Sequence, residues 1–119
     1  MSSDQRPAGP AKPGFTTRQV HAGVVPDPLT GAILTPIYQT TTYVQESVDR
    51  YLAKGYSYSR SANPTVRALE QKLTDLEGGS DCICFGTGMA AINGLFLAFL
   101  SAGDHAIVSD VVYGGTYRL

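Results

Sequence analysis

A short glycine turn near the C-terminal end of the chain separates two apolar segments and limits how both can fold. Residues 81–85 are apolar apart from Asp81, the turn Gly-Thr-Gly-Met follows at 86–89, and a long apolar pattern covers 88–100. We therefore expect a buried strand, a tight turn and a buried helix. After a turn at 101–104, residues 105–110 predict a second strand, which makes this segment a βαβ unit with parallel strands and a right-handed crossover.

The rest of the chain predicts little core of its own. Residues 1–14 are rich in Pro, Gly, Ser and Ala, so we expect a disordered tail there. Residues 15–62 contain several prolines and a Thr/Tyr run, which favour an extended arm, with one or two helical turns at 46–53. Such an arm is expected to pack on a neighbouring subunit. Residues 63–119 are predicted to be the start of an α/β domain, incomplete because two strands do not make a full sheet.

One helix is predicted over residues 64–77 from strong local signals. Asn63 suits the N-cap position, Pro64 suits the first helical position, and a Gly-Gly pair at 78–79 suits the end. Apolar residues recur at spacings of three and four, which gives one apolar stripe: Val66, Leu69, Leu73 and Leu76. The charged and amide residues opposite are expected to face solvent: Arg67, Glu70, Gln71, Lys72 and Asp75.

Composition narrows the possible partners and the compartment. The 119 residues carry a net charge of −1, whereas nucleic-acid and anionic-membrane binding both require a basic excess. No apolar run approaches the roughly 18 residues of a membrane span, and no signal sequence is recognisable, so a cytoplasmic location is expected. Cys82 and Cys84 are expected to be buried free thiols in a reducing compartment, because with His105 they do not supply the four ligands of a metal site.

The turn at 86–89 is a candidate anion site. Gly88 would let an anion approach the backbone, the amides of Gly88 and Met89 would lie in the first helical turn, and Thr87 could add a hydroxyl donor. No Lys-Ser/Thr pair follows, so the turn is not a P-loop, and it lacks the third glycine of a dinucleotide-binding fold. The alternative is an ordinary tight turn that needs glycine for its geometry.

Two further groups suit a phosphorylated aromatic ligand. In extended backbone before the helix, Tyr58 and Arg60 would project from the same side, where a phenol and a guanidinium could bind phosphate together. Tyr113 follows the second predicted strand, at the sheet edge where open parallel sheets bind ligands, and its ring could stack on a flat cofactor. The alternatives are a surface arginine beside a packing tyrosine, and a turn tyrosine without a ligand.

Six motifs, in order along the chain, give it a specific resemblance. From about Thr17 to Leu119 the sequence resembles the pyridoxal 5'-phosphate (PLP) enzymes of cysteine and methionine metabolism, which include cystathionine γ-synthase, cystathionine γ-lyase, methionine γ-lyase and the O-acylhomoserine sulfhydrylases. The motifs are Thr17-Arg18-Gln19-Val20-His21-Ala22-Gly23, Thr35-Pro36-Ile37-Tyr38-Gln39-Thr40-Thr41, Tyr58-Ser59-Arg60 through Asn63-Pro64-Thr65, Leu76-Glu77-Gly78-Gly79, Gly88-Met89-Ala90-Ala91 and Tyr113-Gly114-Gly115-Thr116.

The resemblance implies a fold and a set of site residues. It implies the large domain of the PLP-dependent transferase fold type I, with the cofactor phosphate bound by Gly88 and Met89. It implies that Tyr58 and Arg60 reach the same phosphate in a neighbouring subunit, within a homo-oligomer that is a dimer of dimers. It also implies that Tyr113 is catalytic, stacking on the cofactor and assisting proton transfer or leaving-group chemistry at the γ-carbon.

The expected reaction is γ-replacement or γ-elimination on a small sulfur amino-acid substrate, O-acylhomoserine or cystathionine. Methionine γ-lyases commonly carry a cysteine where this chain has Gly115, so the sequence looks closer to the cystathionine synthase/lyase branch, with the methionine γ-lyase and sulfhydrylase branches as alternatives.

The family also needs a Schiff-base lysine. Lys12, Lys54 and Lys72 are poorly placed for that role, so we expect the 119-residue chain alone to be inactive and to be the N-terminal part of the enzyme. Two alternatives remain open: a catalytically inert chain that docks on a full-length homologue, and a separate anion-binding module.

Overall fold

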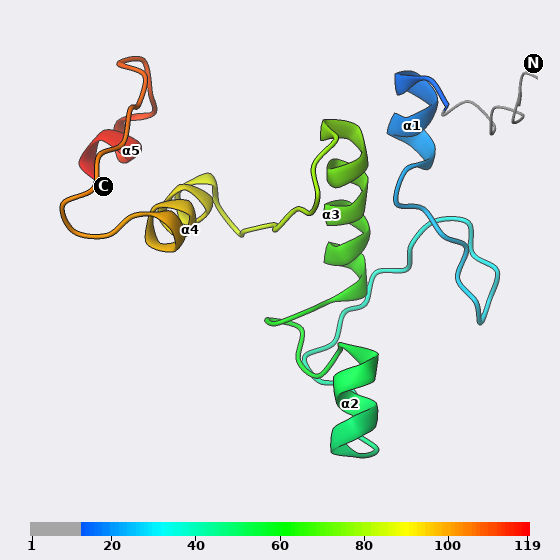
Figure 1. The fold of residues 1–119 in the computed structure, drawn as a ribbon. Coiled ribbons are helices and arrows are strands. Elements are labelled where there is room, and N and C mark those ends of the chain that lie inside the picture. The colour runs from blue at the N-terminus through cyan, green and yellow to red at the C-terminus, as the bar shows by residue number, and fades with distance from the viewer. Residues whose placement is uncertain (1–12) are drawn as a thin grey trace, which may run out of the picture. The chain divides into compact units, whose positions relative to one another are not determined.

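Five helices make up the regular structure of the described residues. The computed structural model describes residues 13–119, apart from the side chains of residues 51 and 52, so Lys12 and nearly all of the predicted tail lie outside the described residues. Figure 1 labels the helices as α1 (Phe15–His21), α2 (Val48–Lys54), α3 (Pro64–Glu77), α4 (Gly88–Phe99) and α5 (Gly114–Arg118). The chain divides into two units, one ending at Cys82 and the other spanning Ile83–Leu119.

Helix α3 begins and ends where the sequence predicts. Asn63 has extended backbone and its side chain accepts a hydrogen bond from the Thr65 amide, and Pro64 is the first helical residue. Gly78 ends the helix in the left-handed conformation, with φ of 68°, and its amide donates to the Thr74 carbonyl. Local capping therefore fixes both ends of the longest helix in the described part of the chain.

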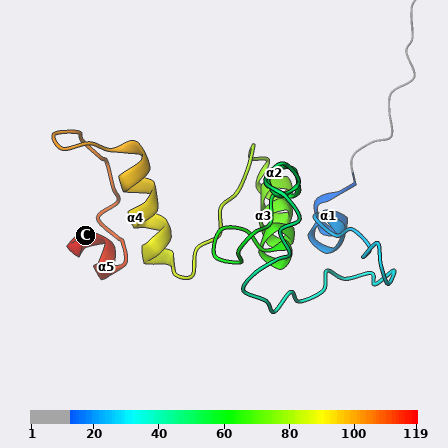
Figure 2. The same cartoon turned by 90° about the horizontal axis from the view of Figure 1, so that it is seen from below.

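Helix α1, which the local sequence pattern does not predict, lies alongside α3 (Figures 1 and 2). Arg18 Nε donates to Asp75 Oδ2 at 2.9 Å, and Lys72 Nζ donates to the Val20 carbonyl at 3.4 Å. Asp75 is exposed, as the sequence predicts, whereas Lys72 is half-buried, which differs from the prediction. Both residues also anchor the N-terminal helix to α3.

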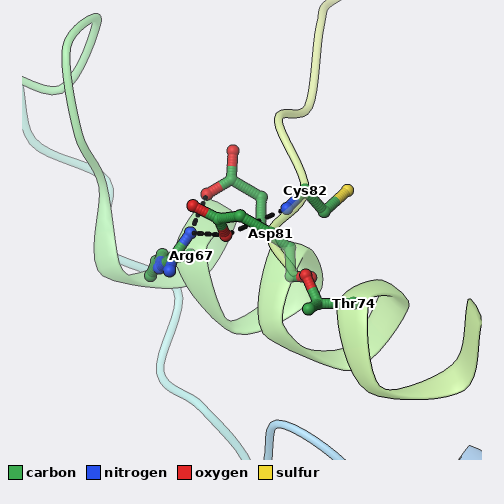
Figure 3. A network of polar contacts seen from close by, with 5 residues as sticks. Arg67, Thr74, Asp81 and Cys82 are labelled. Carbon is green, nitrogen blue, oxygen red and sulfur yellow. Dashed lines mark hydrogen bonds and ion pairs between the residues drawn. The ribbon is translucent and has the colours of Figure 1, made fainter. Parts of the chain in front are cut away.

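A second ion-pair network joins α3 to the segment that follows it (Figure 3). Arg67 Nη1 donates to Asp81 Oδ1 at 2.8 Å and to Glu70 Oε2 at 3.3 Å, and Asp81 also accepts from the Cys82 amide at 2.9 Å. The Cys82 amide, followed by the Arg67 guanidinium, lowers the pKa of Asp81. The hydrogen bond with Asp81 raises the pKa of Arg67. Both groups therefore stay charged over a wider pH range than usual.

The predicted βαβ unit is only partly present. Helix α4 and the turn at 101–104 form as expected, with Asp104 accepting a hydrogen bond from the Ser101 amide at 2.8 Å. Within residues 13–119, however, no strand forms, and the only ladder contact is an isolated antiparallel bridge between Thr42 and Tyr58. A strand exists only where a neighbour completes its hydrogen bonds. Segments 81–85 and 105–110 have no such neighbour among the described residues.

Apolar side chains are left uncovered throughout the described residues. None of these side chains is fully buried, Cys82 and Cys84 are half-buried, and Leu97 and Phe99 of α4 are each 77% exposed. The prediction of a fully buried α4 and fully buried cysteines is therefore wrong, because the described residues cover these side chains only in part. None of the described helices is long and apolar enough to cross a membrane.

Candidate functional site

The start of α4 presents two free amide donors. Thr87 has extended backbone, with φ −148° and ψ 154°, and its Oγ1 accepts a hydrogen bond from the Ala90 amide at 3.1 Å. The first helical bond runs from the Ala91 amide to the Thr87 carbonyl. The amides of Gly88 and Met89 precede that bond, so they have no acceptor within the helix. They point beyond the N-terminal end of α4, where the helix dipole favours negative charge.

The backbone at this end of α4 is open to a ligand. A Cβ built on Gly88 would meet no atom within 4 Å, so the space beside its backbone is empty. The Thr87 hydroxyl accepts from Ala90 through a lone pair, which leaves its proton available for donation. Three donors, two amides and one hydroxyl, can thus face an anion such as a phosphate group.

Tyr113 and Met89 approach each other because residue 115 is a glycine. A Cβ on Gly115 would lie 2.7 Å from Tyr113 Cε1 and 3.0 Å from Met89 Sδ. Thr116 on α5 also donates a weak hydrogen bond to the Met89 sulfur at 3.8 Å. Tyr113 is 72% exposed, so its ring is accessible for stacking. Neither α5 nor the steric role of Gly115 is predicted by the local sequence pattern.

Tyr58 and Arg60 are close together, as the sequence predicts, although the backbone differs from the prediction. The Arg60 guanidinium carbon lies 4.9 Å from the centre of the Tyr58 ring. The segment is a turn rather than extended chain, since the Ser61 amide donates to the Tyr58 carbonyl at 3.0 Å. Among the described residues Arg60 forms no ion pair, so its charge is available to an anion.

The candidate residues form two groups, one in each unit. Tyr58 and Arg60 lie in the unit that ends at Cys82, whereas Thr87, Gly88, Met89 and Tyr113 lie in the unit Ile83–Leu119. No group of three or more His, Cys, Asp or Glu side chains in the described part of the chain is arranged to hold a metal ion.

Comparison with known proteins identifies the family. The model of the Cys/Met metabolism PLP-dependent enzymes matches residues 16–119, and the chain therefore belongs to this family. Its members use PLP, whose phosphate is the kind of anion that the free amides of α4 suit.

Three similar proteins carry related names. Over 108 residues the chain is 51% identical to a cystathionine beta-lyase of Coxiella burnetii, covering 91% of this chain and 27% of the relative. Over 106 residues it is 50% identical to a probable cystathionine gamma-synthase of Herpetosiphon aurantiacus, covering 89% of this chain and 32% of the relative. The crystal structure of metB from Corynebacterium glutamicum superposes with a TM-score of 0.82 at 47% identity, covering 90% of this chain and 28% of that one.

The chain thus spans about a quarter to a third of the length of these relatives. The structural match supports fold type I for the domain to which the chain belongs, which agrees with the fold class that the sequence predicts. The strands of the βαβ unit remain a prediction.

Proposed function

We propose that the protein carrying this chain is a PLP-dependent transsulfuration enzyme that acts on sulfur amino acids, by γ-replacement or γ-elimination on O-acylhomoserine or cystathionine. The observation that carries the proposal is the family match over residues 16–119, joined to the free amides at the start of α4. Relatives at about 50% identity are named cystathionine beta-lyase and cystathionine gamma-synthase, which supports a substrate of this class.

In this proposal the chain holds the cofactor through its phosphate. The amides of Gly88 and Met89 would donate to phosphate oxygens, and the Thr87 hydroxyl would add a third hydrogen bond. The empty space beside Gly88 supports a close approach of the phosphate to the backbone. PLP, when bound, supplies an electron sink for negative charge that develops on substrate carbon atoms.

Tyr58 and Arg60 would complete the phosphate site of a neighbouring subunit. Arg60 offers a guanidinium with no competing carboxylate among the described residues, and the adjacent Tyr58 offers a hydroxyl donor. A contribution in trans requires a homo-oligomer, which we propose to be a dimer of dimers. Residues 15–62 would form the arm that carries this pair to the neighbouring subunit.

Tyr113 would act on the cofactor ring and on a substrate proton. Its exposed ring can stack on a flat aromatic system, and its hydroxyl can hold or transfer a proton at the leaving group on the γ-carbon. Gly115 supports this role, because a larger residue there would push the ring away from Met89.

A proline substitution tests the phosphate site without removing the helix. Gly88 is the first residue of α4, where proline is tolerated, and the extended backbone of Thr87 suits a residue that precedes proline. Gly88→Pro therefore deletes one amide donor but retains the helix start. Loss of one hydrogen bond to a charged group, about 1.5–3 kcal/mol, predicts PLP binding weaker by about 10- to 150-fold in equilibrium titration.

The matched control is Gly88→Ala, which also adds bulk at position 88 but retains the amide, so the difference between the two variants reports the lost amide donor. We expect the alanine variant to bind PLP much more tightly than the proline variant. Equal binding by the wild type and both variants would refute the phosphate site at α4. Absence of PLP binding by the wild-type protein would refute the proposed function as a whole.

A further inference from the structure

The side chain of Asn63 connects three segments of the N-terminal unit. Its Oδ1 accepts from the Thr65 amide at 2.9 Å and so caps α3. Its Nδ2 donates to the Tyr38 carbonyl at 2.9 Å and to Ser59 Oγ at 3.2 Å. A donor at Thr65 and an acceptor at Tyr38 admit only one orientation of the amide. Asn63 therefore caps a helix with one atom and ties two loops together with the other.

Thr65 strengthens the attachment of the arm to α3. Its Oγ1 donates to the Pro36 carbonyl at 2.8 Å and accepts from the Tyr38 amide at 2.9 Å. Both side chains are half-buried, and together they fix the backbone of residues 36–38 against the N-terminal end of the helix. We call the side chains of Ser59, Asn63 and Thr65, with the backbone of Tyr38, the Asn63 clasp.

Ser59 brings the Tyr58–Arg60 turn into the clasp. Its hydroxyl donates to the Thr40 carbonyl and accepts from Asn63 Nδ2 and from the Tyr43 hydroxyl, which uses its full hydrogen-bonding capacity. Its amide also donates to the Thr41 carbonyl at 2.8 Å. Ser59 lies between Tyr58 and Arg60 in the sequence, so a fixed Ser59 fixes the backbone from which both side chains project.

We propose that Asn63 is a positioning residue for phosphate recognition, acting through Ser59 on the Tyr58–Arg60 turn. The inference rests on the proposed function, in which that turn binds the cofactor phosphate of a neighbouring subunit. The Nδ2 group fixes the orientation of the turn relative to the start of α3, and the phosphate affinity of the site depends on that orientation.

Asn63→Asp separates the positioning role from helix capping. Aspartate caps a helix as well as asparagine does, so α3 keeps its start. The atom that faces the Tyr38 carbonyl becomes an acceptor, however, and Ser59 has only one proton to share between the new carboxylate and Thr40. The matched control is Gln71→Glu, which makes the same amide-to-carboxylate change on an exposed face of α3.

The measurement compares PLP with pyridoxal, which lacks the phosphate, by equilibrium titration of the protein that carries this chain. In Asn63→Asp we expect the preference for PLP over pyridoxal to fall by about tenfold, the effect of one lost charge-assisted hydrogen bond, with pyridoxal affinity unchanged. In an Arg60→Ala background the same substitution is expected to change the preference much less, because its effect passes through the turn. Gln71→Glu is expected to leave the preference unchanged.

Each outcome decides the question. A wild-type protein without preference for PLP overturns the proposed function, and this inference with it. If the wild type prefers PLP over pyridoxal and Asn63→Asp keeps that preference, the inference is wrong but the proposed function stands. The same holds if Asn63→Asp loses equal affinity for PLP and for pyridoxal. If Asn63→Asp does not fold, Ser59→Ala replaces it. This variant keeps the cap and the Tyr38 contact, and it must show the same selective loss for the inference to stand.

Discussion

The packing of the N-terminal arm against α3 depends on a glycine. Gly23 has φ of 68°, a backbone conformation that costs a residue with a Cβ roughly 1–2 kcal/mol. A Cβ at this position would also lie 2.7 Å from the Ala68 carbonyl oxygen and 2.8 Å from the Lys72 amide nitrogen. Both atoms belong to the backbone of α3, so they cannot move aside by rotating a side chain.

Gly23→Ala should therefore lose stability in two ways. The strained backbone conformation contributes about 1–2 kcal/mol, and overpacking against rigid neighbours contributes about 1–3 kcal/mol more. Gly31→Ala isolates the first effect, because Gly31 has φ of 72° and a Cβ there would meet nothing within 4 Å. Both substitutions restrict the unfolded chain in the same way, so that contribution cancels in the comparison.

Urea unfolding of the protein that carries this chain measures both losses. We expect Gly23→Ala to reduce the free energy of unfolding by about 1–3 kcal/mol more than Gly31→Ala does. We also expect faster hydrogen exchange at the Lys72 amide in the first variant only. Equal losses in the two variants would show that α1 and the following turn do not pack on α3 as the structure indicates.

Three further predictions concern the Thr87 cap of α4, the dependence of stability on pH through Asp81, and the position of the Tyr113 ring. Thr87→Ala should lower the free energy of unfolding by about 1 kcal/mol and speed hydrogen exchange at the Ala90 amide. Thr87→Ser should keep the stability and the slow exchange of the wild type. Unchanged exchange in the alanine variant would contradict the cap. The lowered pKa of Asp81 stabilises the folded state above the ordinary carboxyl pKa of about 3.9, and this stability is lost as the pH falls below that value. Asp81→Asn should therefore flatten the pH dependence of the unfolding midpoint between about pH 5 and pH 2, and an unchanged slope would exclude the ion pair. Gly115→Ala should remove nuclear Overhauser contacts between the Tyr113 ring and Met89. The control Gly114→Ala, whose Cβ would meet nothing within 4 Å, should retain these contacts. Contacts that persist in the Gly115→Ala variant would contradict the packing of Tyr113 on Met89.

Helix α3 was predictable because its determinants are local. Asn63, Pro64 and Gly78 act on residues within a few positions, and the same holds for Thr87 at the start of α4. Helix α1 was not predictable in this way. It has seven residues, too few for a stable isolated helix, and its contacts with Lys72 and Asp75 cross more than fifty positions of sequence.

The candidate site shows the same difference between local signals, which are predictable, and contacts between distant segments, which are not. Alternation along an extended chain predicts that Tyr58 and Arg60 are neighbours, and they are, but a turn held by Thr41 and Ser61 brings them together. The strands that would flank α4 depend on pairing with other segments, which no local pattern supplies. The apolar pattern of residues 81–85 and 105–110 indicates segments that are suited to a strand, but it does not indicate which segment would pair with them.

The threonine that starts α4 also determines which amides remain for a ligand. Because Thr87 Oγ1 accepts from Ala90, the third amide of the helix is satisfied internally, and only those of Gly88 and Met89 point outward unpaired. An apolar residue at position 87 would leave three amides free and a helix start that frays more readily. Capping therefore reduces the number of donors but fixes the direction of those that remain. A ligand with several oxygens around one centre binds more tightly to fixed donors than to mobile ones, because the donors lose no further conformational entropy on binding.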